Sequence, residues 1–169
     1  MNSYKNEITQ AELRYFLSYC ESTGVFTWNV NKSPKARAGS IAGVLNGKGY
    51  INLTINSKIY KAHRLAWLYV YGEFPRYGLD HINGNRADNR IKNIREATQL
   101  ENNQNRKKPI NNTTGFIGVS KNKQGKFFSS IMFNGVRKYL GNFFTPEEAY
   151  KAYTNAKLDL HKFNPVVRT

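Results

Sequence analysis

Residues 79–95 read LDHINGNRADNRIKNIR and bring acidic, histidine, amide and arginine side chains together in one short stretch. Its pattern predicts short strands joined by a long polar loop. Asp80 and His81 are adjacent, and adjacent side chains on a strand point to opposite faces unless the backbone distorts. Because a strand end that enters a loop supplies that freedom, we expect Asp80 and His81 to lie at such an end.

The distribution of charge places this stretch between two basic regions. The chain of 169 residues contains 26 Lys and Arg against 11 Asp and Glu, a formal net charge of +15. No acidic residue occurs at positions 22–72 or 102–146. Acidic residues between them include Glu73, Asp80, Asp88, Glu96 and Glu101. A chain this basic usually has an anionic partner, and the arrangement fits a metal site flanked by phosphate-binding surfaces. The alternative is a soluble protein that is merely basic.

Cysteine content and hydropathy indicate the compartment. Cys20 is the single cysteine, so we expect neither a disulfide nor a structural zinc site built on cysteine, and a reducing compartment is the default. No apolar run approaches the length of a membrane span, and the N-terminus lacks a secretory apolar segment. We therefore expect a soluble, cytoplasmic protein that is not secreted and has no membrane partner.

The pattern along the first part of the chain predicts a small α+β domain over residues 1–105. Thr9 and Glu12 have capping-box spacing, which predicts a helix that runs to about Tyr19. Alternating and apolar runs predict the remaining elements. These are strands at 25–28, 50–55 and 59–61, and helices at 62–71 and 100–106.

A second small domain is predicted at residues 113–169. It follows residues 106–112, which are basic, contain proline and are typical of a linker. Residues 116–144 predict three strands, with Asn134-Gly135 as a tight hairpin turn. Thr145 and Glu148 form a second capping box with proline at the first helical position. The apolar stripe of this helix comprises Ala149, Ala152, Tyr153, Ala156, Leu160 and Phe163.

The first of these domains resembles the HNH endonucleases, or His-Me finger nucleases, in particular their phage and group I intron homing members. The resemblance extends over about residues 7–105. Its specific parts are TGVFTW at 23–28, AHRLAW at 62–67 and the core from Asp80 to Asn102. It implies a ββα-metal fold and a metal-dependent endonuclease that hydrolyses phosphodiester bonds in duplex DNA. Such hydrolysis needs a base that activates water, a divalent cation that stabilises the leaving oxygen, and a group that holds the base in the correct tautomer.

The same resemblance implies a role for each polar residue. His81 would be the general base, and Asn93 would orient it through the imidazole Nδ1–H. Asp80 and Asn102 would hold a divalent metal, with Mg²⁺ expected and Mn²⁺ as an alternative, because hard oxygen ligands suit these ions better than zinc. Asn102 stands where many relatives carry a final histidine. His63 is a further catalytic candidate, and its role stays open between a phosphate contact and a structural hydrogen bond.

Other interpretations compete with these. Asp88 and Asn89 could form a second ligand pair, but both are common in turns, so loop structure is favoured. His161 is expected to be incidental. The alternative function is a non-catalytic DNA-binding regulator built on a degenerate HNH fold, although such a fold should have lost its catalytic residues and these are present. A third function, RNA binding, rests on charge alone.

Residues 113–163 resemble the APETALA2-type DNA-binding domain of plant ethylene-response proteins, a three-stranded sheet covered by one helix. The similar segments lie at 114–120, 125–127, 139–143 and 147–153. That family lays its sheet in the DNA major groove. This sequence departs from the plant pattern where Ile117, Ser120, Asn122 and Met132 replace arginines that read bases. The resemblance therefore implies the fold and the docking role, but not a sequence preference.

Double-stranded DNA is the expected partner, and no obligatory protein partner is evident. If a phage encodes the chain, the host cytoplasm is its place of action. The residues expected to contact DNA are Arg64, Arg86, Arg106, Lys107, Lys121, Lys123, Lys126, Phe128, Arg137, Lys138 and Tyr139.

Overall fold

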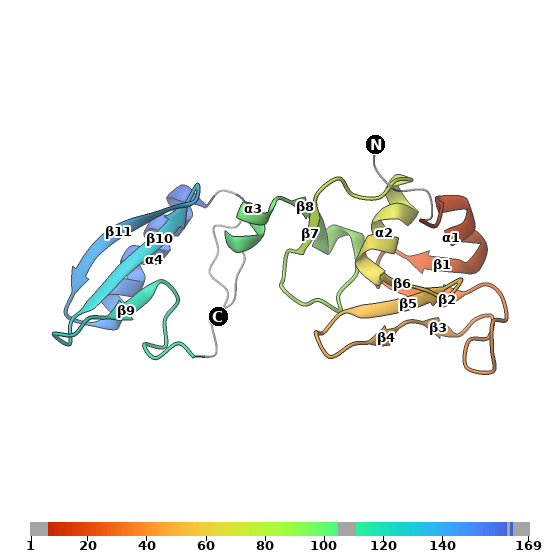
Figure 1. The fold of residues 1–169 in the computed structure, drawn as a ribbon, viewed down its shortest axis with the longest axis horizontal. Helices are drawn as coiled ribbons and strands as arrows, with labels where there is room; N and C mark the ends of the chain where they lie inside the picture. Colours follow the sequence, from red (N-terminus) through yellow and green to blue (C-terminus); the bar gives the residue numbers. More distant parts are fainter. Residues whose placement is uncertain (1–6, 105–110, 162, 164–169) are drawn as a thin grey trace. The chain divides into compact units, whose positions relative to one another are not determined.

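The computed structural model describes residues 7–104, 111–161 and 163 (Figure 1). Helices and strands are mixed along the chain, which confirms the predicted α+β class. The chain forms two compact units, Met1–Ala97 and Thr98–Thr169. This division assigns residues 98–104 to the second unit, whereas the predicted first domain extends to residue 105; the predicted domain and linker bounds stay a prediction. In the described part of the chain, no helix has the length and apolar character needed to cross a membrane.

The N-terminal helix begins where its capping box predicts. Helix α1 (Gln10–Phe16) starts after Thr9, whose side-chain oxygen accepts a hydrogen bond from the Glu12 amide while the Glu12 carboxylate accepts one from the Thr9 amide. The prediction that this helix runs to Tyr19 is wrong. Strand β1 (Leu17–Cys20) follows at once, with alternating buried and exposed residues, because it pairs with strand β2 (Val25–Trp28). Pairing across the sheet outweighs the local helical signal.

Small antiparallel sheets and two helices surround the core of the first unit. The remaining strands are β3 (Ile41–Ala42), β4 (Val44–Leu45), β5 (Ile51–Ile55), β6 (Lys58–Lys61), β7 (Gly78–His81) and β8 (Ile94–Ala97). Among the described residues their sheets have the orders β1-β2-β3, β4-β5-β6 and β7-β8. Helix α2 (Ala62–Tyr71) packs against β5 and β6 and ends, as predicted, at Gly72, whose left-handed backbone caps it (Figure 1). The shared core includes Leu13, Leu17, Phe26, Leu53 and Leu65.

The segment that carries the predicted chemistry is a two-stranded ribbon with a long loop. Strand β7 ends at His81 and pairs with β8, so that Asp80 lies opposite Arg95 and His81 opposite Ile94. The short 3₁₀ helix η1 (Ile91–Asn93) leads from the loop into β8. The expectation that Asp80 and His81 lie at a strand end is thus confirmed.

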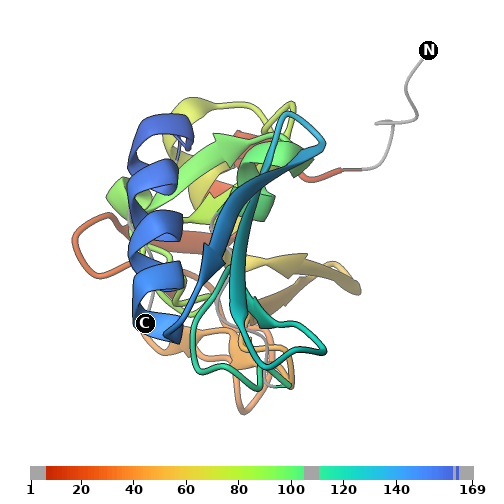
Figure 2. The same cartoon turned by 90° about the vertical axis from the view of Figure 1, so that its left-hand side faces the viewer.

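The second unit contains a three-stranded sheet covered on one face by a helix. Its elements are helix α3 (Gln99–Gln104), strands β9 (Val119–Lys121), β10 (Phe127–Phe133) and β11 (Val136–Phe143), and helix α4 (Pro146–Leu160). The sheet has the order β11-β10-β9, and α4 packs along it (Figures 1 and 2). The second capping box is present, with Thr145 and Glu148 bonded reciprocally and proline opening the helix.

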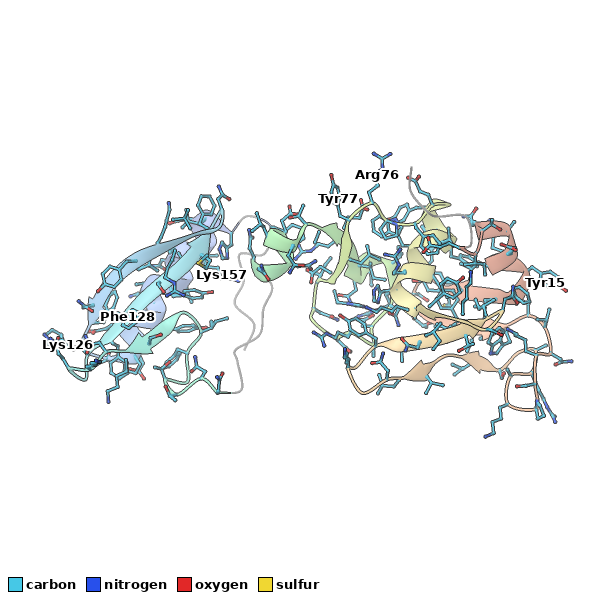
Figure 3. The ribbon with its side chains drawn as sticks, in the orientation of Figure 1. Tyr15, Arg76, Tyr77, Lys126, Phe128 and Lys157 are labelled. Carbon is cyan, nitrogen blue, oxygen red and sulfur yellow. The ribbon has the colours of Figure 1, made fainter. Side chains whose placement is uncertain are left out.

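The apolar stripe of α4 contains a residue that its pattern did not include. Ala149 and Tyr153 are buried, as predicted, against a core that includes Val119 and Ile131. Lys157, which is labelled in Figure 3, lies one turn after Tyr153 and is also buried, with only 2% of its surface exposed. A lysine is rarely this buried unless its ammonium group is hydrogen-bonded.

Gly118 controls how closely β9 and α4 approach. Its φ is +76°, and a Cβ atom there would lie 2.0 Å from the ring of Tyr153. Gly118→Ala should therefore destabilise the second unit by about 2–4 kcal/mol, through overpacking and left-handed strain together. Calorimetric unfolding would measure this, with Gly115→Ala as the control, since Gly115 has φ +81° but a Cβ atom there would have no neighbour within 4 Å. Equal losses in both variants would contradict the packing role.

Candidate active site

His81 lies in a cluster of three rings supplied by separate segments of the first unit. It is the last residue of β7 and is 5% exposed. The ring of His63, from α2, meets the His81 ring edge-on with centroids 4.9 Å apart. Tyr50, just before β5, lies 5.3 Å from His63 and 6.0 Å from His81 between ring centroids. His63 is therefore in contact with the predicted base itself.

Burial keeps both imidazoles neutral near pH 7. It lowers the pKa of His81, while the nearby side chain of Asn89 and the charge of Asp80 act in the opposite direction. Burial, followed by the proximity of His81, lowers the pKa of His63 to about 3. A neutral imidazole is the form that accepts a proton from water, so His81 is in the state that a general base requires.

His63 has a polar atom inside the protein that its surroundings leave without a partner. Its Nδ1 is buried, and no residue in the described part of the chain hydrogen-bonds it. A buried polar atom of this kind usually has an explanation, such as water or a ligand. The two roles predicted for His63, a phosphate contact and a structural hydrogen bond, both stay open.

The buried His63 should make stability depend on pH. Its pKa is about 3 in the folded protein and about 6.5 when exposed, so between these values the unfolded chain binds a proton that the folded chain does not. The free energy of unfolding should fall as pH decreases through this window, by up to about 1.4 kcal/mol per pH unit. Denaturant unfolding followed by tryptophan fluorescence reports on the first unit, because Trp28 and Trp67 both lie there.

The control is His63→Gln, which removes the titrating group. In this variant the free energy of unfolding should fall less steeply between pH 6.5 and 3 than in the wild type, while its dependence on denaturant concentration stays the same. Parallel curves for the two proteins would contradict the burial of a neutral imidazole at position 63.

Asp80 is held by an ion pair across the ribbon. Arg95, its partner in β8, places Nη2 2.9 Å and Nε 3.2 Å from Asp80 Oδ2. Among residues 7–104, 111–161 and 163, no group of three or more His, Cys, Asp and Glu side chains could hold a metal ion. A single hard carboxylate still fits Mg²⁺, which usually keeps several waters and binds through one or two carboxylates together with substrate phosphate. A cation at Asp80 would share that carboxylate with Arg95.

Asn102 lies in α3, in the second unit. It is half-buried, and its backbone amide donates to Thr98 O at 2.9 Å. None of the described residues hydrogen-bonds its side-chain amide. An amide oxygen is a suitable ligand for Mg²⁺ and Mn²⁺, so the residue type fits the predicted ligand role. Its partnership with Asp80 stays a prediction.

Asn93 braces the loop that follows His81. Its side chain is buried, donates from Nδ2 to Asp88 O at 2.8 Å, and accepts at Oδ1 from the Asn83 amide at 3.0 Å. These bonds span the loop at both ends, so any effect of Asn93 on His81 includes an indirect one through the backbone. The predicted direct bond from Asn93 to the imidazole stays a prediction.

Asp88 also belongs to the structure of this loop. Its carboxylate accepts hydrogen bonds from Arg90 and from Asn83 Nδ2, the latter at 2.7 Å. The bond from Arg90 holds the pKa of the Asp88 carboxyl well below its usual range. These contacts agree with the interpretation of Asp88 as a loop residue and leave its oxygens occupied.

Asn89 and Gly24 position the site but were not predicted to do so. Asn89 is 2% exposed, its backbone carbonyl accepts from the Tyr19 hydroxyl at 2.7 Å, and its side-chain Nδ2 donates to Ala87 O at 3.0 Å. Gly24 has φ +74°, and a Cβ there would lie 2.4 Å from the Arg90 amide nitrogen. The turn between β1 and β2 therefore packs directly on the loop. The Thr23-Gly24 pair is the sequence signal for this contact.

Basic side chains border the ring cluster. Lys61 Nζ lies 4.7 Å and the Arg86 guanidinium 5.0 Å from the centroid of Tyr50, and Arg86 Nη1 donates to Lys48 O at 3.0 Å. We call Lys48, Lys61 and Arg86 the basic rim; each is exposed. Only Arg86 among them was predicted to contact DNA. Arg64, which was also predicted, stacks on the ring of Phe74 at 5.1 Å.

The sheet of the second unit has one face free of α4. Its exposed residues include Met132, Arg137 and Tyr139, and the register pairs Met132 with Arg137 and Ser130 with Tyr139. The rings of Phe128 and Tyr139 lie 6.3 Å apart between centroids. Since Ser129 and Ile131 are buried under α4, the alternation along β10 directs Phe128, Ser130 and Met132 to the open face.

The lysines of the second unit divide between the two faces. Lys121 pairs with Phe127 and Lys138 with Ile131, so both project on the side of the sheet that α4 covers, because directly paired residues share a face. Lys123 and Lys126 are exposed at the turn between β9 and β10. The predicted contacts Arg106 and Lys107 lie outside the described residues.

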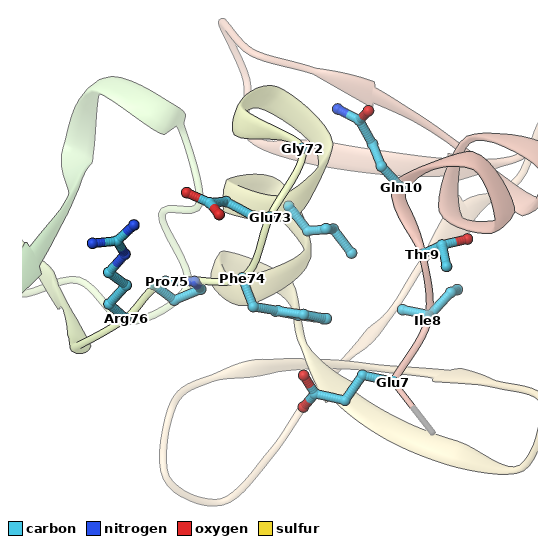
Figure 4. A pocket seen from close by; sticks show the side chains of 10 residues that line it. Glu7, Ile8, Thr9, Gln10, Gly72, Glu73, Phe74, Pro75 and Arg76 are labelled. Atoms are coloured by element: carbon cyan, nitrogen blue, oxygen red, sulfur yellow. The ribbon is translucent and has the colours of Figure 1, made fainter. Parts of the chain in front are cut away.

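A pocket elsewhere in the first unit contains none of the predicted site residues (Figure 4). It has a volume of about 530 Å³ and lies between the start of α1 and the end of α2. Ile8, Phe74 and Pro75 form part of its lining, together with the carboxylates of Glu7 and Glu73. Arg76 also lines this pocket, so its charge is mixed, whereas basic side chains border the ring cluster at His81, which is the better candidate for chemistry on DNA.

Comparison with known families supports this choice. Residues 60–104 match the model of the HNH endonuclease family. This segment is HNH-like. The HNH segment contains every residue predicted to act in catalysis or to hold the metal, namely His63, Asp80, His81, Asn93 and Asn102. It is less than half of the chain and extends from the first unit into the second.

Two relatives are similar over longer stretches. Protein 3.8 of Escherichia phage T7 is 38% identical over 71 residues, a match that covers 40% of this chain and 59% of the phage protein. A structure of the HNH homing endonuclease I-HmuI, described as showing DNA binding and cleavage, is 20% identical with a TM-score of 0.41, covering 86% of this chain and 85% of that one. The family match at residues 60–104 supports the HNH resemblance of the site segment, whereas the APETALA2-type resemblance of residues 113–163 stays a prediction.

Proposed function

We propose that this chain is a metal-dependent HNH endonuclease that hydrolyses phosphodiester bonds in duplex DNA. The observation that carries the proposal is the state of His81 within the HNH segment. It is a neutral, buried imidazole at a strand end, beside the carboxylate of Asp80 and the basic rim. A base, an oxygen ligand for a cation and side chains that attract phosphate are the parts that hydrolysis needs.

In the proposed reaction His81 accepts a proton from a water molecule, whose oxygen forms a new bond to phosphorus while the bond to the leaving sugar oxygen breaks. Asn89 and Asn93 hold the loop beside the imidazole in place, through the bonds from Asn89 Nδ2 to Ala87 O and from Asn93 Nδ2 to Asp88 O. Asp80 and Asn102 would hold Mg²⁺, with Mn²⁺ as the alternative. That ion, when bound, stabilises negative charge on the leaving oxygen.

The second unit is proposed to dock the enzyme on DNA through the face that α4 leaves open. Arg137 would contact phosphate there, while Phe128 and Tyr139 supply an aromatic surface. Because Arg137 is the one arginine that the described residues place on this face, we expect phosphate positioning to outweigh base readout. The phage relative supports the proposal that the enzyme is encoded by a phage or a mobile element and acts in the host cytoplasm.

The alternative is a regulator that binds DNA without cutting it. The experiment that decides is incubation of the protein with long duplex DNA, with Mg²⁺ or with EDTA, followed by sequencing of the ends. Ends that arise with Mg²⁺ and not with EDTA support the endonuclease. Binding of the DNA by the protein, without new ends under either condition, supports the regulator.

The basic rim should contribute measurably to DNA affinity. Each phosphate contact that is lost flattens the slope of log affinity against log salt by about 0.9. Lys61→Ala combined with Arg86→Ala should therefore flatten it by about 2. The control, Lys35→Ala with Arg37→Ala, removes the same charge from exposed positions outside the HNH segment. Equal slopes for the two double variants would show that the rim has no special contact with DNA.

A further inference from the structure

We propose that Lys157 is a positioning residue, which anchors α3 and with it the predicted ligand Asn102. The assignment of a metal to Asn102 rests on the proposed function, whereas the anchor rests on the geometry of the second unit. A residue of the second unit, which is proposed to dock on DNA, would then contribute to cleavage without touching DNA.

The anchor is a buried hydrogen bond from an ammonium group to the end of a helix. Lys157 Nζ donates to Gln104 O at 2.6 Å, and Gln104 is the last residue of α3. The last carbonyls of a helix have no partner within the helix, and positive charge is favourable at that end. Lys157 meets both requirements with one side chain, which projects from α4 (Figure 3).

Helix α3 needs such support from outside. Its described residues are Gln99–Gln104, and none of them is buried. Helices this short are not stable in isolation. At its start, Thr98 and Glu101 are bonded reciprocally, with the Glu101 carboxylate accepting from the Thr98 amide at 2.8 Å. These capping bonds join residues at the start of α3 to each other, so they do not attach the helix to the rest of the unit. The bond from Lys157 does.

The ammonium group at position 157 is not explained by the packing of α4. Lys157 continues the stripe that begins with Ala149 and Tyr153 and is buried against the sheet. A methionine or leucine would fill that position without the cost of burying a charge. Among the described contacts, the lysine adds to an apolar side chain the bond to Gln104 O.

The bond acts close to Asn102. Asn102 precedes Gln104 by two residues, and its side-chain amide is half-buried. Groups that orient a metal ligand commonly change metal affinity by about 10–100-fold when they are removed. Loss of the anchor should therefore weaken the response to Mg²⁺ while leaving the DNA-docking face, on the other side of the sheet, unchanged.

The test compares Lys157→Met with Lys157→Arg, which keeps a donor, and with Lys151→Met, which removes an exposed lysine from the same helix. Hydrogen exchange of the amides at 102–104 should become about tenfold faster or more in Lys157→Met, with smaller changes in the other two. In cleavage assays the Mg²⁺ concentration for half-maximal rate should rise about tenfold or more, while the Kd for DNA stays within about twofold of wild type.

Unchanged exchange at 102–104 in folded Lys157→Met would overturn the anchor. Faster exchange with an unchanged Mg²⁺ response would overturn the link to Asn102. If Lys157→Met does not fold, the comparison passes to Lys157→Gln, with the same criteria. If wild-type protein does not cleave DNA, the proposed function fails. The exchange measurement alone then decides whether Lys157 anchors α3.

Discussion

Replacing His81 with alanine should lower the rate of DNA cleavage by about 10²–10⁴-fold, the usual cost of removing a general base. DNA affinity should stay within about twofold, because the variant removes no positive charge at pH 7: burial lowers the pKa of His81 and leaves it neutral. Single-turnover cleavage with enzyme in excess would measure the chemical step, and a binding assay in EDTA would measure affinity.

The matched control for this variant is His161→Gln. His161 is buried to a similar extent, with 4% exposed, and bonds Met132 O at 2.7 Å, but it lies outside the HNH segment. This variant should cleave within about threefold of wild type, because His161 has no role in the proposed reaction and its loss acts through the stability of the second unit. Equal losses in both variants would mean that His81 matters for folding and not as a base.

Replacing Asp80 with asparagine should reduce cleavage at limiting Mg²⁺ by at least about 100-fold. Asparagine keeps the shape of the side chain and removes the charge that attracts the cation. Asn102→Ala should have a smaller effect, since it loses a neutral ligand, and raised Mg²⁺ or Mn²⁺ should restore part of its rate. Cleavage rates measured over a range of metal concentrations would separate affinity for the metal from the maximal rate.

Asp88→Asn is the control for the metal ligands. Asp88 bonds Arg90 and Asn83 within the loop, so its loss should lower the rate by disturbing the loop, and added metal should not restore it. If EDTA-treated wild-type enzyme cleaves at full rate, no metal is needed and the roles assigned to Asp80 and Asn102 are both wrong.

The elements that could be predicted from the sequence are those with local causes. The capping boxes at Thr9 and Thr145 mark two helix starts, because their bonds join residues three apart. Gly72 ends α2 for the same kind of reason. Strand β1 was missed because its conformation depends on pairing with β2, and a helical pattern cannot reveal a partner strand.

The candidate site was predictable in its residue types and less so in its contacts. The HNH segment carries Asp80 and His81 in a recognisable pattern, yet the neighbours of His81 come from distant positions. Tyr50 reaches it through the fold and has no signature of its own, and Asn89 has only the signature of a turn residue. Lys157 was missed for a chemical reason, since a lysine within an apolar stripe is normally expected to reach water.

Charge counts also cannot assign lysines to faces. The basic stretch after residue 102 predicts a phosphate-binding surface, and the register shows that Lys121 and Lys138 share the face of α4. Arg137, in contrast, pairs with Met132 of β10 and so lies on the open face. The strand register, which sequence alone leaves open, decides this difference.

The central claim is that a water molecule activated at His81 breaks phosphodiester bonds in DNA. Its most direct test is cleavage of duplex DNA with Mg²⁺ in water enriched in ¹⁸O, followed by mass spectrometry of the phosphate at the new ends. The proposed reaction predicts one ¹⁸O atom per strand cut by wild-type enzyme, and no such product above background with His81→Ala. Ends without ¹⁸O, or equal labelled product from His81→Ala, would contradict it.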